Sequence, residues 1–237
     1  MTKWFVIIFF LLSNLPLFSQ YNGNDFSVGI YGVYTTSASV FLNPNAPDIV
    51  LRNESFLIED IFSPGADIRY RASDPLIIGL SVEYINTTAT GPNLNVFLDG
   101  SVVTLNVDDG FLLIPVELSA YYLLPFSTEE FKFLMGGGIA YYNGEFIRKI
   151  GDAEVTNVEK EAAFGIQVSV SMDYIFSDKI AFRFKMKFRD PQFTVSSKYS
   201  KQEVEYQGHT IILPEESFET KINMDGVTFM LGAAFQF

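Results

Sequence analysis

The sequence predicts an all-β fold in which eight antiparallel strands close into an up-and-down transmembrane β-barrel. Three observations predict it. Eight segments alternate apolar with small or polar residues at a period of two, the period of side chains along a strand. The connections between these segments alternate between short and long. Hydrophobic residues make up 48% and aromatic residues 16% of the chain, yet no later segment reaches the roughly 18 consecutive apolar residues of a spanning helix.

The first 20 residues have the layout of a secretory signal peptide. Lys3 precedes an apolar stretch, residues 4–12, and Pro16 and the small residue Ser19 follow it. An N-terminal membrane anchor is the alternative, but the stretch is shorter than the about 20 residues that a spanning helix needs. We therefore expect residues 1–20 to be a signal peptide and residues 21–237 to form one outer-membrane barrel domain.

Charge and cysteine content exclude several classes of protein. The formal net charge is −12 and the chain has no Cys. Loss of Lys3 with the signal peptide leaves 15 basic against 28 acidic residues, a net charge of −13. This balance argues against nucleic acid as a partner, because nucleic acid requires a basic surface. Without Cys there is neither a disulfide nor a lipid-anchored Cys after cleavage.

Four of the predicted strands lie in the N-terminal half. Each has an unbroken apolar face, and the opposite face carries small or charged residues. In the fourth segment, for example, Glu117 and Ser119 lie opposite a register that contains Val116 and Leu118. The four segments are residues 25–34, 65–72, 76–84 and 112–124.

The other four strands show the same pattern more sharply. In the seventh segment Phe182 and Phe184 alternate with Arg183 and Lys185. The eighth segment is GVTFMLGAAFQF, which ends the chain on Phe237. The four segments are residues 131–142, 164–174, 180–189 and 226–237.

The connections predict which side of the membrane each end of the barrel faces. The short ones are rich in Pro, Ser and Asp, as tight turns are: residues 73–75, 125–130 and 177–179. The long ones are about residues 36–62, 87–109, 143–160 and 191–224. Short periplasmic turns and long outer loops are typical of outer-membrane barrels. With an even number of strands, both termini are then periplasmic, and the long loops either prolong the strands or bind a ligand.

The size of the lumen indicates which face of each strand points inward. An eight-stranded barrel is only wide enough for side chains to fill. Eight faces rich in Phe, Met, Ile and Tyr would not fit there, so we expect them to contact lipid. The charged faces then form an internal salt-bridge network instead of an open pore, because buried charges must be paired or hydrated. Its predicted members are Asp67, Arg69, Arg71, Glu83, Glu117, Asp173, Arg183, Lys185, Lys187 and Arg189.

Tyrosines near the strand ends predict aromatic girdles at the two membrane interfaces. Ordinary strand propensity is the alternative explanation. The tyrosines concerned are Tyr34, Tyr70, Tyr84, Tyr122, Tyr141, Tyr142 and Tyr174.

Several of these segments resemble a known family. LIPVELSAYYLLP (residues 113–125), FKFLMGGGIAYY (131–142) and FGIQVSVSMDYIF (164–176) are similar to strands of the Bacteroidetes-type outer-membrane protein β-barrel domain family. The resemblance covers roughly residues 20–237, and Glu117 and Ser119 depart from the family's usual residues. It implies a location in the bacterial outer membrane. It also implies that the terminal aromatics, Phe235 and Phe237, serve as the insertion signal for the barrel-assembly machinery.

Residues that could carry chemistry are few, and we predict no catalytic, cofactor or metal site. His209 is the one His and lies in the last long connection. Asp108, Asp109 and Gly110 read as a turn, and Gly136 to Gly138 as a place of close packing. Pro115 predicts a bulge, or a kink that opens a lateral exit to the bilayer.

The function predicted from these observations is a non-enzymatic integral outer-membrane protein. Its role would be structural, or binding through the outer loops, with a lumen filled by side chains. A narrow channel for small or hydrophobic solutes is the alternative. A lipid A-modifying enzyme and a secretion-system accessory barrel are less favoured than either. The expected partners are outer-membrane lipid, the assembly machinery during insertion, and an unidentified extracellular ligand.

Overall fold

The computed structural model describes residues 25–98, 101–206 and 208–237, so the predicted signal peptide lies outside the described residues. Within these described residues the fold is all-β apart from one short helix. The elements are β1 (Phe26–Phe41), α2 (Ile49–Asn53), β2 (Ser55–Arg71), β3 (Leu76–Glu83), β4 (Ile85–Leu98), β5 (Ser101–Leu123), β6 (Phe131–Ile150), β7 (Ala153–Lys160), β8 (Ala163–Ser177), β9 (Ile180–Arg189), β10 (Gln192–Tyr199), β11 (Glu203–Tyr206), β12 (His209–Ile212), β13 (Phe218–Asn223) and β14 (Val227–Gln236).

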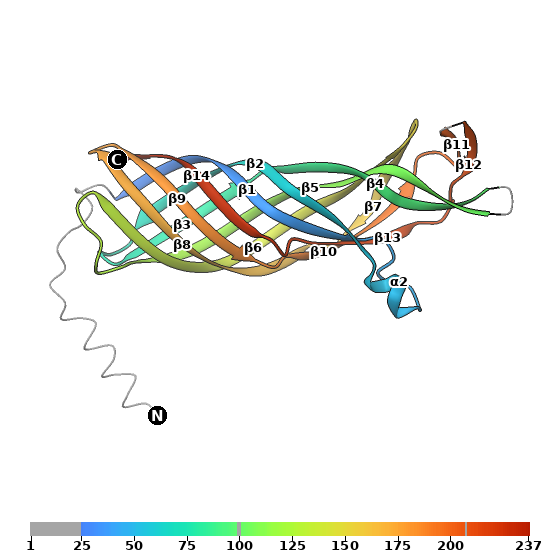
Figure 1. The fold of residues 1–237 in the computed structure, drawn as a ribbon. Helices are drawn as coiled ribbons and strands as arrows, with labels where there is room; N and C mark the ends of the chain where they lie inside the picture. The colour runs from blue at the N-terminus through green and yellow to red at the C-terminus, as the bar shows by residue number, and fades with distance from the viewer. Residues whose placement is uncertain (1–24, 99–100, 207) are drawn as a thin grey trace, which may run out of the picture.

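Backbone pairing closes a ring through eight strands. The order around the ring is β1, β2, β3, β5, β6, β8, β9 and β14, and every pairing is antiparallel. The ring closes where the C-terminus meets β1: Phe26 N–H donates to the Phe237 carbonyl at 3.0 Å, and Phe237 N–H donates to the Phe26 carbonyl at 2.9 Å. Figure 1 shows these strands tilted around a common axis.

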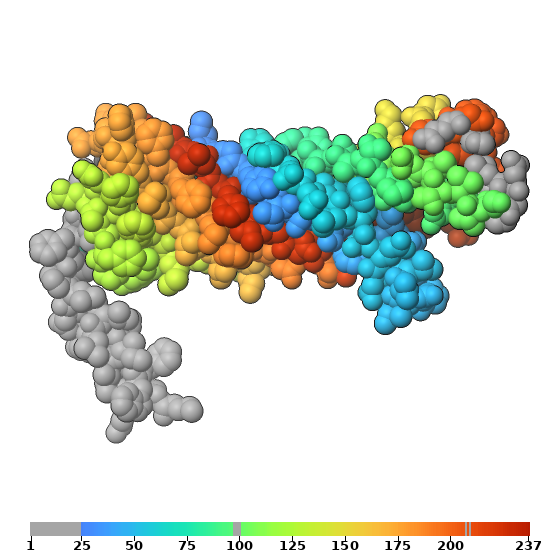
Figure 2. Space-filling view, in the orientation of Figure 1, coloured from blue at the N-terminus to red at the C-terminus, as the bar shows by residue number. Residues whose placement is uncertain are grey.

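The two ends of the molecule differ in their connections. Short connections join β2 to β3, β5 to β6, and β8 to β9, as the sequence predicts. They lie at the end that also holds Asp25 and Phe237, which we call the turn end (Figure 1). The opposite end, which we call the loop end, carries α2 and the β11–β12 hairpin, and α2 stands out from the wall there (Figure 2).

Most residues of the predicted long connections are in strands. β1, β2, β5 and β6 run far beyond the predicted segments, and four further paths continue after a short break, as β4, β7, β10 and β13. In the loop-end half β13 pairs with β1 and β10, β10 with β7, and β7 with β6. Of the two explanations offered for the long connections, prolonged strands account for most of their residues.

Apolar side chains lie on the outer face of the strands in the turn-end half and on the inner face in the loop-end half. In β9, Phe182 and Phe184 are exposed on the outer face, whereas Arg183 and Lys185 are buried inside. β10 continues the same path, and there Phe193 and other apolar side chains are the buried ones. An apolar outer face suits hydrocarbon, and an apolar inner face suits water. The same strand path therefore has an apolar outer face in the turn-end half and an apolar inner face in the loop-end half.

The loop-end half is filled by a hydrophobic core. Its members come from β1, β2, β4, β5, β6, β8, β10 and β13, so this core links nearly every strand path of the wall. The largest buried side chains in it include Phe111, Tyr142, Phe146 and Phe193. Tyr142 was predicted to belong to an interfacial girdle, but it points into this core, so the prediction is wrong for that tyrosine.

One seam in the loop-end wall has no backbone pairing. Among the described residues, β2 and β4 form no ladder, although each pairs with its other neighbour. At its turn-end limit the seam is closed by the hydrogen bond from Tyr84 N–H to the Pro64 carbonyl, 3.1 Å. Side chains cover the seam above it: a Cβ atom on Gly91 would lie 2.7 Å from Cε2 of Phe56.

Pro115 lies beside this break without forming a bulge. The β5–β6 register runs through Pro115 and Tyr142 without a shift, so the predicted bulge is wrong. Because Pro has no backbone N–H to donate, it lies where the ladder is interrupted: by register it is across from Glu83, the last residue of β3, just before the break between β3 and β4. The close packing predicted at the glycine run is present, since a Cβ on Gly138 would lie 2.1 Å from the Leu118 carbonyl.

Candidate functional site: a buried ion network across the lumen

A first group of charges bridges the lumen near the turn end. Arg183 on β9 donates to Asp67 on β2 at 2.7 Å and to Asp173 on β8 at 2.9 Å. Arg69 Nε donates to the same Asp67 at 3.0 Å, and its Nη1 lies 3.7 Å from Asp173. All four side chains are nearly inaccessible to solvent. The alternation of each strand brings them together, since each occupies the inward register of its own strand.

A second group lies deeper, toward the middle of the molecule. Lys187 donates to Glu117 at 2.8 Å and also to Glu83. Arg189 donates to Glu83 at 2.8 Å and to Glu117 at 3.3 Å. The two acids stand on β3 and β5 and the two bases on β9, so these bonds cross the lumen from one wall to the opposite wall.

Lys185 lies between the two groups and has a different environment. Its Nζ donates to the Tyr121 hydroxyl at 3.2 Å and lies 5.9 Å from the centre of the Tyr31 ring. No carboxylate of the described residues is within salt-bridge distance of it. Arg69 also lies over the Tyr121 ring, with its Cζ 4.4 Å from the ring centre. These cations and aromatic rings occupy the width of the lumen between the two ion groups.

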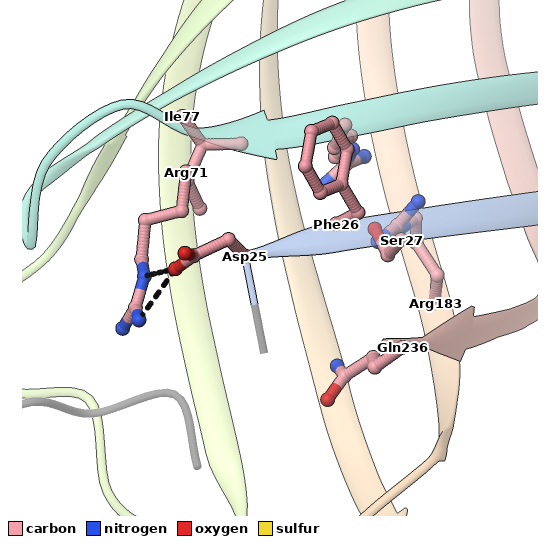
Figure 3. Close-up of a pocket in the computed structure, with 8 residues that line it drawn as sticks. Asp25, Phe26, Ser27, Arg71, Ile77, Arg183 and Gln236 are labelled. Carbon is pink, nitrogen blue, oxygen red and sulfur yellow. Dashed lines mark hydrogen bonds and ion pairs between the residues drawn. The ribbon is translucent and has the colours of Figure 1, made fainter. Parts of the chain in front are cut away.

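Arg71 is the predicted network residue that the structure does not bring into the lumen centre. It lies at the turn-end rim, where it contacts Asp25 at 2.9 Å and Asp74 at 3.6 Å. Figure 3 shows this pair at the edge of a small cavity, apart from Arg183. Arg71 is the last residue of β2, where the ring of strands opens to solvent.

The outer wall around this network is apolar and bounded by two aromatic belts. Phe26 packs on Tyr70 at the turn end, with ring centres 4.8 Å apart. Closer to the loop end, Tyr34 packs on Phe62, with ring centres 5.0 Å apart. The turn-end belt consists of Phe26, Tyr70, Tyr122, Phe131, Tyr174, Phe182 and Phe237. The second belt consists of Tyr34, Phe62, Tyr84, Tyr141, Phe164, Phe188 and Phe229.

The chain's two terminal aromatics belong to this outer wall. Phe235 and Phe237 are exposed, and Phe237 stacks on Phe26 with ring centres 6.1 Å apart. Their predicted part in insertion is a property of the assembly process and stays a prediction.

An ion pair that the sequence reading missed lies beyond the second belt. Asp109, predicted to be in a turn, is fully buried within β5 and accepts two hydrogen bonds from Arg148 on β6, at 2.6 and 2.7 Å. Tyr199 accepts a third at 3.2 Å. Burial by itself lowers the pKa of Arg148, but the hydrogen bond and charge of Asp109 outweigh it and raise that pKa. The signal available in the sequence was the alternation of Leu105, Val107 and Asp109 on one register.

The described residues contain few other chemical candidates. They include no cluster of three or more potential metal-binding side chains. No helix in the described part of the chain is long and apolar enough to cross a bilayer. The backbone of His209 begins β12, opposite Tyr206 in the β11–β12 hairpin.

Comparison with known proteins identifies the fold. No family model matches the sequence, and no curated protein sequence matches it either. The resemblance to the Bacteroidetes-type barrel family therefore stays a prediction. Among solved structures, the outer membrane protein OprG from Pseudomonas aeruginosa superposes with a TM-score of 0.62 at 15% identity, covering 90% of this chain and 96% of that chain. Neisserial surface protein A gives a TM-score of 0.49 at 12% identity, covering 90% and 97%. The similarity to OprG shows that this chain shares the fold of a small outer-membrane protein.

Proposed function

We propose that this chain is an integral protein of the bacterial outer membrane, folded as an eight-stranded up-and-down barrel with its turn end and both termini in the periplasm. The observation that carries the proposal is the exchange of faces along the strands. The wall between the two aromatic belts is apolar outside and charged inside, whereas the wall beyond them has an apolar interior. A protein in water throughout would have no reason to reverse its faces partway along.

The spacing of the belts supports a membrane location. Phe26 and Tyr34 stand eight residues apart on β1. At about 3.3 Å per residue and a strand tilt near 40°, the belts are about 20 Å apart along the barrel axis. The apolar band of outer-membrane barrels is about 25 Å tall between its aromatic girdles. The two belts therefore fit the two interfaces of one bilayer.

We propose that the lumen does not conduct and that the protein acts by binding at its loop end. The cross-lumen ion pairs and the Lys185–Tyr121 contact argue against a channel along the axis, since no ion can pass without breaking them. The loop end offers two hollows of about 330 and 80 Å³, and polar side chains that include Asn43, Glu54 and Asn93 contribute to their walls. We assign the protein no enzymatic step, and its partners remain the lipid, the assembly machinery and an extracellular ligand.

Gel migration tests the membrane barrel. A chain without residues 1–20, refolded in detergent, should migrate differently before and after boiling, because a closed barrel resists the gel detergent until it is heated. The full chain should fractionate with the outer membrane. A protein that stays soluble without detergent and shows no shift on boiling would overturn the proposal.

Planar-bilayer recording tests the closed lumen. We expect no steady conductance steps from refolded protein, because the ion pairs and aromatic rings fill the lumen between the belts. Protease protection of the reconstituted strands is the control, since it shows that silent bilayers contain inserted protein. Steady steps from protein shown to be inserted would replace the closed lumen with the narrow channel.

A further inference from the structure

A small cavity opens at the turn end of the lumen, below the first group of charges. Three arginines line it, Arg69, Arg71 and Arg183, against a single carboxylate, Asp25. Ser27 and Gln236 complete its polar wall, and Figure 3 shows them near Arg183. Asp25 is already bound by Arg71. The wall of this cavity is therefore richer in donors than in acceptors.

The buried side-chain atoms at this cavity that make no hydrogen bond are all donors. Gln236 is 3% exposed and its Nε2 has no hydrogen-bond acceptor. Arg69 is 3% exposed, and neither its Nη1 nor its Nη2 has one. A buried donor without a hydrogen-bond acceptor destabilises the folded protein, and more so when it is charged. What these three nitrogens lack is a species that only accepts hydrogen bonds.

The charge count in the lumen points to the same kind of species. Two buried sets are left aside: the Asp109–Arg148 pair, and Lys132, on which the charge of Glu129 acts. The other buried charged side chains of the described residues are four acids and five bases: Asp67, Glu83, Glu117 and Asp173 against Arg69, Arg183, Lys185, Lys187 and Arg189. Excess positive charge in a low-dielectric interior is costly unless an anion balances it.

The size of the cavity limits the ligand to one small ion. Its volume is about 20 Å³, and about 10–15 Å³ already accommodates one water. We infer that the turn-end mouth of the lumen binds one small monovalent anion of the size of chloride, held by Arg69 and Gln236 with Arg183 beside it. This site goes beyond the proposed function, since it concerns the periplasmic mouth and not the loop end.

Chloride dependence of stability tests the site. The protein without residues 1–20 is folded in detergent, and its unfolding midpoint is read from the heat-modified gel band in sodium chloride or in sodium gluconate at equal ionic strength. Gluconate is too large for the cavity. Chloride at about ten times its dissociation constant should raise the midpoint by about 3–6 °C over gluconate. Equal midpoints in the two salts would overturn the inference, because water alone would then fill the cavity.

A substitution at Gln236 sharpens the test. Gln236→Glu places a carboxylate among the unpartnered donors and should make the midpoint independent of chloride, at or above the value of the unaltered protein in gluconate. Gln192→Glu is the matched control, because Gln192 is exposed on β10 far from the cavity, and it should keep the full chloride response. A chloride response that persists unchanged in Gln236→Glu would count against the site.

Crystals grown in bromide give a readout that needs no variant. An anomalous peak within hydrogen-bond distance of Arg69 and Gln236 is expected. A cavity without such a peak at saturating bromide would overturn the inference even if the Gln236 variants failed to fold.

Discussion

Lys187→Met is expected to destabilise the folded protein by about 3–5 kcal/mol, the cost of leaving a buried charge without its partner. Lys187 contacts both Glu83 and Glu117 and is fully buried, so its loss leaves two carboxylates to share Arg189. Reversible urea unfolding in lipid vesicles measures the change. We expect the effect to be among the largest that a single substitution can cause here.

Two further variants separate charge from packing. Lys160→Met is the matched control, because Lys160 pairs with Glu145 at an exposed position of the loop end, where ion pairs contribute about 0–1 kcal/mol. Adding Glu117→Gln to Lys187→Met should recover at least half of the lost stability, since one carboxylate then faces one guanidinium. Equal costs at Lys187 and Lys160, or no recovery in the double variant, would show that the network carries no buried charge.

Ile30→Arg is expected to destabilise the inserted protein by about 2–4 kcal/mol, the cost of Arg at the middle of the lipid face of a barrel. Ile30 lies four residues from both Phe26 and Tyr34, midway between the two aromatic belts, and is 69% exposed. The same vesicle unfolding assay measures this change.

Val102→Arg is the control that identifies the solvent. Val102 is 67% exposed on β5 at the loop end, so the two side chains are almost equally accessible and differ mainly in position along the barrel. We expect a cost near zero at Val102, because it faces water. If both positions tolerate Arg equally, the belt around Ile30 does not face hydrocarbon and the membrane proposal fails.

Strong alternation is what made much of the fold readable from the sequence. Residues 180–189 alternate Phe or Ile with Arg or Lys so regularly that both the strand and its two faces follow from the pattern. The short turns were also predictable from local sequence, because Pro, Ser and Asp between two alternating segments favour a tight turn. Neither inference required a distant part of the chain.

The loop-end half was harder to predict because its alternation is weaker and its faces are reversed. Asp109 shows the difficulty: beside Asp108 and Gly110 it has the composition of a turn, yet its partner Arg148 lies 39 residues away on β6. Tyr142 was assigned to a girdle because it lies at the end of a predicted strand, residues 131–142. Its neighbour Tyr141 faces outward, and only the alternation of β6 in the folded protein determines which of the two tyrosines points inward.

The sequence by itself determined that strands form and which residues share a face, because side-chain alternation is a local property of the backbone. Only the tertiary structure decided the identities of the ion pairs, the break beside Pro115, the unpaired seam between β2 and β4, and the reversal of inside and outside. Each depends on the register between strands and on the solvent around them. Those are set by residues far apart in the chain.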